Sequence, residues 1–355
     1  MAIFLGRMPI GAFVAVLAAC TPESPLDSGD TTDSVADTAD SVGDTSDSVG
    51  DTSETDLGAI DAEVLTPPVG PADYSEEESD GPGPRRILLA RSVDGVHYVR
   101  DNVVLTDQGN TPNMLVLPSG RILIYYTGYH LVDDKDNIAV AVSDDNGSTW
   151  SYYYAAMNGF GANHPPIGDP DIVQLPDGSF RMYITNGSSD QTIDIISNVS
   201  ADGFNFEWEG IALDNEGQNR KDSLTQRIGD DYFMYVLQSN DGWMALATSD
   251  NGTSFSYDNV ASRDMNTGGG GPDQYILSNW MPNPDGGQRI FAFNMENQDI
   301  RSFTTVDGAT LTPDLEVSLG PPLNLELERS WVKDAAAQQL ADGTWLMAYV
   351  AEIPI

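Results

Sequence analysis

Two short patterns alternate along the chain from residue 86 onward, and this repetition limits the possible folds more than any other feature. The first pattern is a predicted hairpin, in which an apolar strand, a tight turn and an aromatic-rich strand follow one another. Turn strings such as Leu175-Pro176-Asp177-Gly178 supply the backbone angles that tight turns need, and the flanking residues favour paired strands. The pattern occurs at 114–128, 171–185, 224–238, 279–293 and 336–350.

The second pattern, which we call the Asp-turn, is Ser or Thr, then Asp, then Gly, then an aromatic or large apolar residue. Its copies begin at Ser92, Ser143, Ser200, Thr248 and Thr305. The second and fourth copies resemble the Asp-box of sialidases and related propellers. The resemblance implies that the Asp caps a turn between the outer two strands of a blade, that Gly takes a positive φ, and that the aromatic residue packs between blades. It therefore implies a structural role for these aspartates.

The two patterns alternate with a period of about fifty residues, which is the size of a four-stranded propeller blade. The sequence therefore predicts an all-β, five-bladed β-propeller. An Asp-turn at 92–98 precedes the first hairpin, and no Asp-turn follows the last one, so we expect the N-terminal strands to pair with the C-terminal hairpin. This pairing closes the ring and removes exposed sheet edges. The predicted blades are about 111–157, 165–210, 220–260, 272–314, and 331–355 joined to 86–105.

Residues 1–20 predict a secretion signal, because their apolar run is too short to span a membrane. The run ends in Leu17-Ala18-Ala19-Cys20, which resembles the bacterial lipobox. The resemblance implies that Cys20, the single cysteine, is lipidated and becomes the mature N-terminus. Acyl chains would hold the protein on a membrane, and Thr21 in place of Asp favours an outer-membrane or cell-surface location.

Residues 21–84 predict a disordered acidic tether, and the folded domain is expected at 85–355. No Lys or Arg lies between Cys20 and Arg85, and a seven-residue Asp/Ser/Thr repeat at 33–53 has one apolar residue per unit, too few for a coiled coil. The formal net charge of −39 argues against nucleic-acid binding and against anionic headgroups. We therefore expect membrane contact through the lipid anchor only, and a monomer.

The strings Asp169-Pro170-Asp171-Ile172-Val173 and Leu175-Pro176-Asp177-Gly178, the latter followed by Met182-Tyr183, resemble the five-bladed glycoside hydrolases of the family 43 group, which includes arabinanases, xylosidases and fructosidases. The resemblance covers about 86–355 and implies a carbohydrate ligand. It also implies three acids around a central pocket: an Asp base, an orienting Asp and a Glu general acid. Such a set suits glycoside hydrolysis, because one carboxyl protonates the leaving oxygen while an ionised one activates water.

Residue by residue, the match to this group is mixed. Asn113 stands where the base Asp is expected, Asp171 matches the orienting Asp, and Asp222 stands in place of the Glu acid. Asp273 and Asp334 hold similar places in the fourth and fifth blades, which makes Asp171, Asp222, Asp273 and Asp334 the catalytic candidates. Because an amide cannot accept a proton from water, a non-catalytic glycan- or protein-binding propeller stays open as an alternative.

The candidates for substrate binding are Asn113, Asp169, Arg220, Trp280, Arg329 and Trp331. The two tryptophans are expected near pocket-side strand starts, where they can stack on a sugar. A sialidase-like enzyme is a further alternative, since it needs three arginines and a Tyr nucleophile, and Tyr275 and the arginines Arg220, Arg227, Arg301 and Arg329 are available. The histidines lack zinc-site spacing, so no metal site or cofactor is predicted, although a calcium ion in the central channel stays open.

Overall fold

The computed structural model describes residues 59–71, 81–128, 138–160, 167–187, 193–214, 220–238, 243–257, 263–264, 275–294 and 297–354. The predicted signal peptide, Cys20 and residues 21–58 of the predicted tether lie outside the described residues. Within those ranges, no helix is long and apolar enough to cross a membrane.

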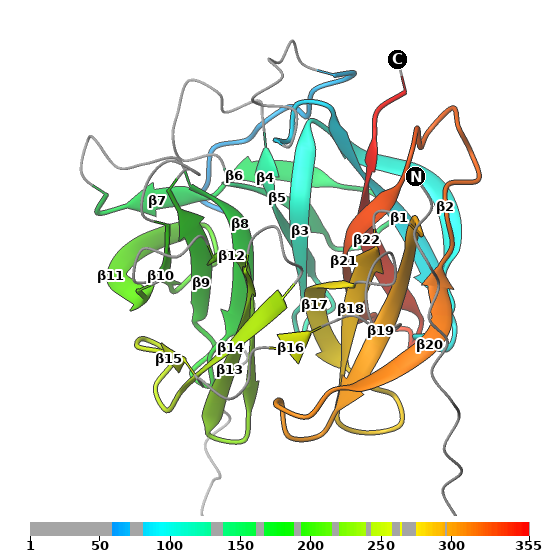
Figure 1. The fold of residues 1–355 in the computed structure, drawn as a ribbon. Coiled ribbons are helices and arrows are strands. Elements are labelled where there is room, and N and C mark those ends of the chain that lie inside the picture. Colours follow the sequence, from blue (N-terminus) through cyan, green and yellow to red (C-terminus); the bar gives the residue numbers. More distant parts are fainter. Residues whose placement is uncertain are drawn as a thin grey trace, which may run out of the picture. The chain divides into compact units, whose positions relative to one another are not determined.

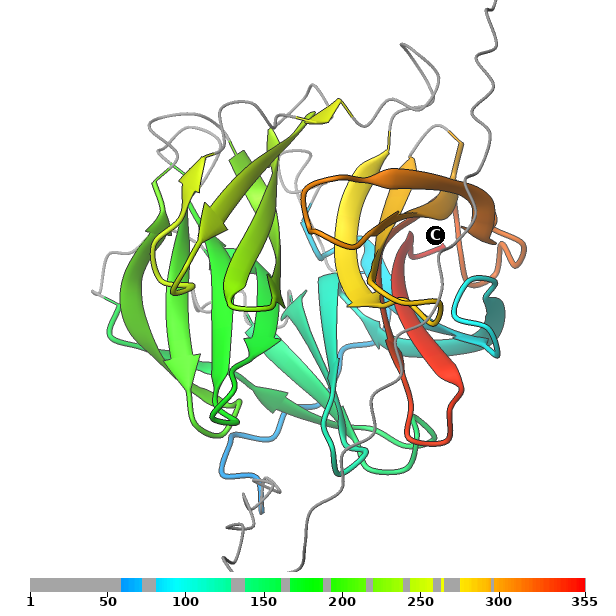
Figure 2. The ribbon, with the colours of Figure 1, turned by 90° about the horizontal axis from the view of Figure 1, so that it is seen from below.

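The described strands form five sheets that are the blades of a β-propeller, which confirms the predicted fold (Figures 1 and 2). Blade 1 contains β3 (Gly109–Val116), β4 (Ile122–Gly128), β5 (Ile138–Ser143) and β6 (Ser151–Tyr154). Blade 2 contains β8 (Ile167–Gln174), β9 (Phe180–Asn186), β10 (Asp194–Ser200), β11 (Asn205–Leu213) and the short β7 (Ala156–Asn158). Blade 3 contains β12 (Arg220–Ile228), β13 (Asp231–Gln238), β14 (Trp243–Ser249), β15 (Ser256–Tyr257) and β16 (Arg263–Asp264). Blade 4 contains β17 (Ile276–Pro282), β18 (Gln288–Asn294), β19 (Asp299–Thr305) and β20 (Thr312–Leu319).

Blade 5 is built from both ends of the folded region. Its strands are β21 (Val332–Gln339), β22 (Trp345–Glu352), β1 (Arg85–Ser92) and β2 (Val99–Asp107). β1 pairs antiparallel with β22 from Arg85↔Glu352 to Ser92↔Trp345, and Figure 1 shows the cyan N-terminal strands beside the red C-terminal ones. The predicted closure of the ring is thus confirmed, and it supplies the third and fourth strands that an isolated C-terminal hairpin would lack.

The folded region begins earlier than the predicted boundary at residue 85. The segment 59–71, assigned above to the tether, lies against blade 1: Leu65 is buried, and its amide donates to the carbonyl of Tyr152 at 2.9 Å. Near its end, the amide of Gly70 donates to Asp107 Oδ2 at 2.6 Å. A short apolar stretch in acidic surroundings is thereby ordered, because it pairs with the free edge of β6 and buries a leucine.

The apolar core is divided among the five interfaces between neighbouring blades. Each interface holds one cluster of buried side chains contributed by two adjacent sheets. Since both faces of every sheet are covered, each blade depends on its two neighbours for burial of its apolar residues.

The Asp-turns join each blade to the preceding one. In the third copy, Asp202 Oδ1 accepts the amides of Phe204 and Asn205, both at 2.8 Å, and Gly203 has a φ of 76°. The fourth copy uses Asn251 in the same position, where its Oδ1 accepts the amides of Thr253 and Ser254. The two turns thus have a common hydrogen-bond pattern, in which the side-chain Oδ1 of an Asp or an Asn caps the turn.

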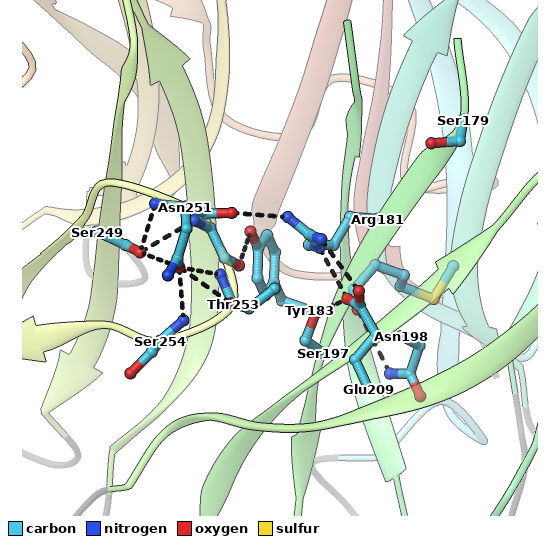
Figure 3. A network of polar contacts seen from close by, with 12 residues as sticks. Ser179, Arg181, Tyr183, Ser197, Asn198, Glu209, Ser249, Asn251, Thr253 and Ser254 are labelled. Carbon is cyan, nitrogen blue, oxygen red and sulfur yellow. Dashed lines mark hydrogen bonds and ion pairs between the residues drawn. The ribbon is translucent and has the colours of Figure 1, made fainter. Parts of the chain in front are cut away.

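Buried tyrosines on the second strand of three blades contact the next Asp-turn. Tyr125, Tyr183 and Tyr235 donate to the carbonyls of Gly203, Gly252 and Gly308, at 2.9, 2.7 and 3.0 Å respectively. Figure 3 shows one such contact between blades 2 and 3, where Arg181 also donates to the Asn251 carbonyl and forms an ion pair with Glu209. These contacts fix the angle between neighbouring blades and therefore the positions of the strands at the axis.

Gly308→Ala tests this docking. A Cβ at Gly308 would lie 2.6 Å from the ring of Phe233 in the preceding blade, whereas a Cβ at Gly343, in an exposed hairpin turn of similar positive φ, meets nothing within 4 Å. Both substitutions should cost about 1–2 kcal/mol for the left-handed conformation, and Gly308→Ala about 1–3 kcal/mol more for overpacking. Urea unfolding of both variants measures the difference, and equal losses would show that the Asp-turn is not tightly docked.

Candidate functional site

The innermost strands β3, β8, β12, β17 and β21 surround the propeller axis, and each is interrupted by a bulge at the same level. Thr111, Asp169, Asp222 and Asp334 occupy equivalent bulge positions and take left-handed φ values of 45° to 54°. A non-glycine residue in this conformation is uncommon, and Asp tolerates it better than most residues because its side chain can hydrogen-bond locally. Four blades therefore place an equivalent residue, with the same backbone conformation, at the axis.

Three cavities follow one another along the axis. The upper cavity, of about 200 Å³, lies at the N-terminal ends of the inner strands and is lined by Asn110, Thr111, Asp169, Lys221, Asp222, Leu237, Ile276, Phe293, Lys333 and Asp334. A middle constriction of about 30 Å³ follows at the level of Asn113, Pro170 and Ser223. The lower cavity, of about 210 Å³, lies at the C-terminal ends of the same strands.

Three aspartates, which we call the acid cluster, line both the upper cavity and the constriction: Asp169, Asp222 and Asp334. Burial raises the pKa of Asp222 well above its usual range, and the neighbouring charge of Asp169, a hydrogen bond with Asp169 and the charge of Asp334 add to this increase. Lys221 acts in the opposite direction. Asp222 therefore keeps its proton at pH values where an exposed Asp is ionised, because two further carboxyls lie beside it in a buried site.

Threonines on the second strands hold two members of the acid cluster through the backbone. Thr127 Oγ1 accepts the amide of Asp169 at 2.9 Å, and Thr185 Oγ1 accepts the amide of Asp222 at 3.2 Å. Lys333 Nζ lies 2.8 Å from Asp334 Oδ2. The sequence analysis did not identify these threonines, although each lies two residues after an equivalent tyrosine, Tyr125 or Tyr183, and this shared spacing is a signal that could have found them.

Asp171 is placed differently from the acid cluster. It is 1% exposed, is absent from the lining of the three cavities, and accepts a hydrogen bond from Asn113 Nδ2 at 3.3 Å. Burial raises its pKa to about 7, while Thr225, Ser223 and Asn113 lower it in part. Asn113 and Asp171 occupy equivalent positions in adjacent blades, so the amide that replaces the expected base supplies a donor to this buried carboxyl.

The remaining predicted residues are spread over the domain. Trp331 contacts two cations: the guanidinium of Arg85 lies 4.4 Å from its ring centroid, and the ammonium of Lys333 lies 5.7 Å from it. The Arg220 guanidinium lies over the Tyr257 ring at 4.1 Å, and Arg329 is exposed. Trp280 lines the lower cavity, at the opposite end from the acid cluster. Asp273 lies outside the described residues.

The arginines considered for a sialidase-like site do not converge. Arg227 lines the lower cavity, whereas Arg220 lies at the upper end of the same strand. Arg301 forms an ion pair with Asp299 at 3.0 Å, and Asp299 also accepts the hydroxyl of Tyr275, so this tyrosine is engaged in a cluster of its own. In the part of the chain that the structure describes, no three His, Cys, Asp or Glu side chains gather closely enough to hold a metal ion.

The fold is similar to that of solved bacterial structures. A glycosyl hydrolase from Bacteroides ovatus matches with a TM-score of 0.52 and 14% identity, over 82% of this chain and 94% of its own. Provisionally assigned glycoside hydrolases from Parabacteroides distasonis and Bacteroides ovatus each match with a TM-score of 0.50 and 14% identity, over 70% and 68% of this chain and 88% and 86% of their own. At this identity the likeness shows the fold alone. No protein-family model and no curated protein matches the sequence.

The raised pKa of Asp171 predicts a pH dependence of stability. Between pH 4 and pH 7 the unfolded chain has lost this proton while the folded protein keeps it, so the free energy of unfolding falls as pH rises and levels off above the folded pKa of about 7. Asp171→Asn should remove a slope of about 1.4 kcal/mol per pH unit. Urea unfolding of both proteins at intervals from pH 4 to pH 8 measures it, and parallel profiles would contradict the assignment.

Proposed function

We propose that the protein is a glycan-processing propeller that hydrolyses a glycosidic bond at the upper cavity. The observation that carries the proposal is the acid cluster, in which a carboxyl that retains its proton lies beside two further carboxyls at one mouth of the axial channel. Glycoside hydrolysis needs this combination, because one group must protonate the leaving oxygen while an ionised group acts on water or on the sugar.

The contacts suggest a role for each member of the cluster. Asp222, with its raised pKa, is the general acid. Asp169 is hydrogen-bonded to Asp222 and tunes its proton affinity, whereas the charge of Asp334 raises the pKa of Asp222 and Asp334 is the base. The ammonium of Lys333 forms an ion pair with Asp334 at 2.8 Å and fixes the position of this carboxyl. The shared fold with glycosyl hydrolases supports this reading at the level of architecture.

A non-catalytic glycan-binding propeller is the second candidate. It is favoured by Asn113, an amide at the position of the expected base, which donates a hydrogen bond to the buried Asp171. In this case the upper cavity would bind the end of a glycan through Asp169, Asp334 and the two lysines without turnover.

We further propose that the lipid on Cys20 anchors the protein to an outer membrane or cell surface, and that the acidic segment before residue 59 holds the propeller away from it. The lipobox resemblance and the run of like charges support this arrangement.

Substitution of the acid cluster separates the two candidates. Asp222→Asn and Asp334→Asn should each lower kcat by about 10²–10⁴-fold on whichever substrate the wild type cleaves in a screen of aryl glycosides and polysaccharides. Asp342→Asn, in an exposed hairpin turn, serves as the matched control and should leave kcat unchanged. Binding of a glycan without turnover by the wild type would favour the second candidate. Turnover that survives both cluster substitutions would place the chemistry elsewhere.

The anchor is tested by Cys20→Ala in the full-length chain expressed in a bacterial host. The wild type should partition into the detergent phase of a Triton X-114 extraction, because each buried methylene of the acyl chains contributes about 0.8 kcal/mol. The variant should move to the aqueous phase. Equal partitioning of the two proteins would exclude lipidation at this cysteine.

A further inference from the structure

We infer that Thr127 and Thr185 are positioning residues, which hold the backbones of Asp169 and Asp222 so that the two carboxyls stay together at the upper cavity. Both threonines are absent from the lining of the three cavities, so each acts through an aspartate and not on a ligand. Their consequence for catalysis rests on the proposed function, in which Asp222 is the general acid. Their effect on the Asp222 carboxyl does not require that function.

The two contacts cross from one blade to the next. Thr127 belongs to β4 of blade 1, and its Oγ1 accepts the amide of Asp169 in blade 2 at 2.9 Å. Thr185 belongs to β9 of blade 2, and its Oγ1 accepts the amide of Asp222 in blade 3 at 3.2 Å. Both threonines are buried. Each of these aspartates is therefore held by the blade that precedes it.

The bulges explain why the two amides need these hydroxyls. Asp169 and Asp222 lie within the register shifts of β8 and β12, so neither residue has a cross-strand partner in its own hairpin. Both also take a φ of 54°, an uncommon conformation that persists only where neighbouring groups hold it. An amide withdrawn from water without a partner costs about 1–3 kcal/mol. Removal of either hydroxyl therefore favours a relaxed bulge.

The position of the two threonines is shared by all five blades, but its residue type is not. Each threonine pairs with the residue directly before the bulge of its own blade, and Leu237, Ala292 and Val350 hold this position in the other blades. Leu237 and Val350 precede blades 4 and 1, whose bulges contain no aspartate. Ala292 precedes blade 5, where Asp334 forms an ion pair with Lys333 at 2.8 Å instead. Threonine at this position therefore occurs only where the next bulge contains an aspartate.

The backbone position matters because the Asp222 carboxyl is hydrogen-bonded to that of Asp169. Burial, the charge of Asp169, this hydrogen bond and the charge of Asp334 raise the pKa of Asp222, and Lys221 lowers it. Lys333, the other charged residue of the upper cavity, is paired with Asp334. A relaxed bulge moves the Asp222 carboxyl away from Asp169 and toward water, so its pKa falls toward the ordinary value.

The experiment titrates the Asp222 carboxyl of the full-length protein by NMR with carbon-13-labelled aspartate, and Asp222→Asn identifies the resonance. Thr185→Val, which keeps the shape but removes the hydroxyl, should lower the apparent pKa of Asp222 by about half a unit or more. Thr185→Ser, which keeps the hydroxyl, should leave it unchanged. The matched control is Thr106→Val, which removes a buried hydroxyl that donates to the Asp107 carbonyl on β2. It should reduce thermal stability to a similar extent without a shift of this pKa.

An unchanged or raised pKa of Asp222 in folded Thr185→Val would overturn the proposal, as would an equal shift in Thr185→Ser. If Thr185→Val does not fold, Thr127→Val takes its place with the same expected fall, because Asp169 raises the pKa of Asp222. On a cleaved substrate, kcat/KM of the valine variant should decline at a lower pH than that of the wild type, since the general acid loses its proton earlier. A shifted pKa in a protein that cleaves no glycan would refute the proposed function and support the positioning role.

Discussion

The pairing of β1 with β22 is the constraint on which the rest of this structure depends. Every blade buries its apolar residues against two neighbours, so an open ring would expose two complete sheet faces to water. The closing blade is completed by β1 and β2, which come from the other end of the folded region. The stability of each end of the folded region therefore depends on the other end. Closure of the ring holds the inner strands in place, and these strands form the walls of the axial channel.

The acid cluster shows how that rigidity is used. Three aspartates take a left-handed backbone conformation and bring their carboxyls to one half-buried site in a chain that already carries a large excess of negative charge. Such an arrangement is unfavourable by itself, since like charges repel and burial disfavours ionisation. It persists because threonines of the neighbouring strands hold the aspartate amides and a lysine pairs with one carboxyl. The scaffold thereby holds a carboxyl of raised pKa beside two further carboxyls.

The two ends of the channel differ in chemistry although the same five strands build both. The upper end collects aspartates and lysines, whereas the lower end collects neutral amides, a hydroxyl and an indole. This division follows from position along each strand, because the bulge lies between the two halves. The two ends of one channel therefore differ in the residues that line them.

The sequence by itself determined the all-β propeller, the number of blades and the closure by the two ends, because each of these follows from a repeat that is visible along the chain. It also directed attention to Asp171, Asp222, Asp334 and Trp280. Only the tertiary structure decided that Asp222 is accompanied by Asp169 and Asp334, that Asp171 packs with Asn113 instead, and that Trp280 lies at the other end of the channel. The physical reason is the bulge in each inner strand: side chains alternate between the two faces with a period of two, and a bulge shifts that phase without leaving a mark in the residue pattern. The placement of residues 59–71 also depends on the tertiary structure, because a short apolar stretch becomes structured only where a free strand edge is available to pair with it.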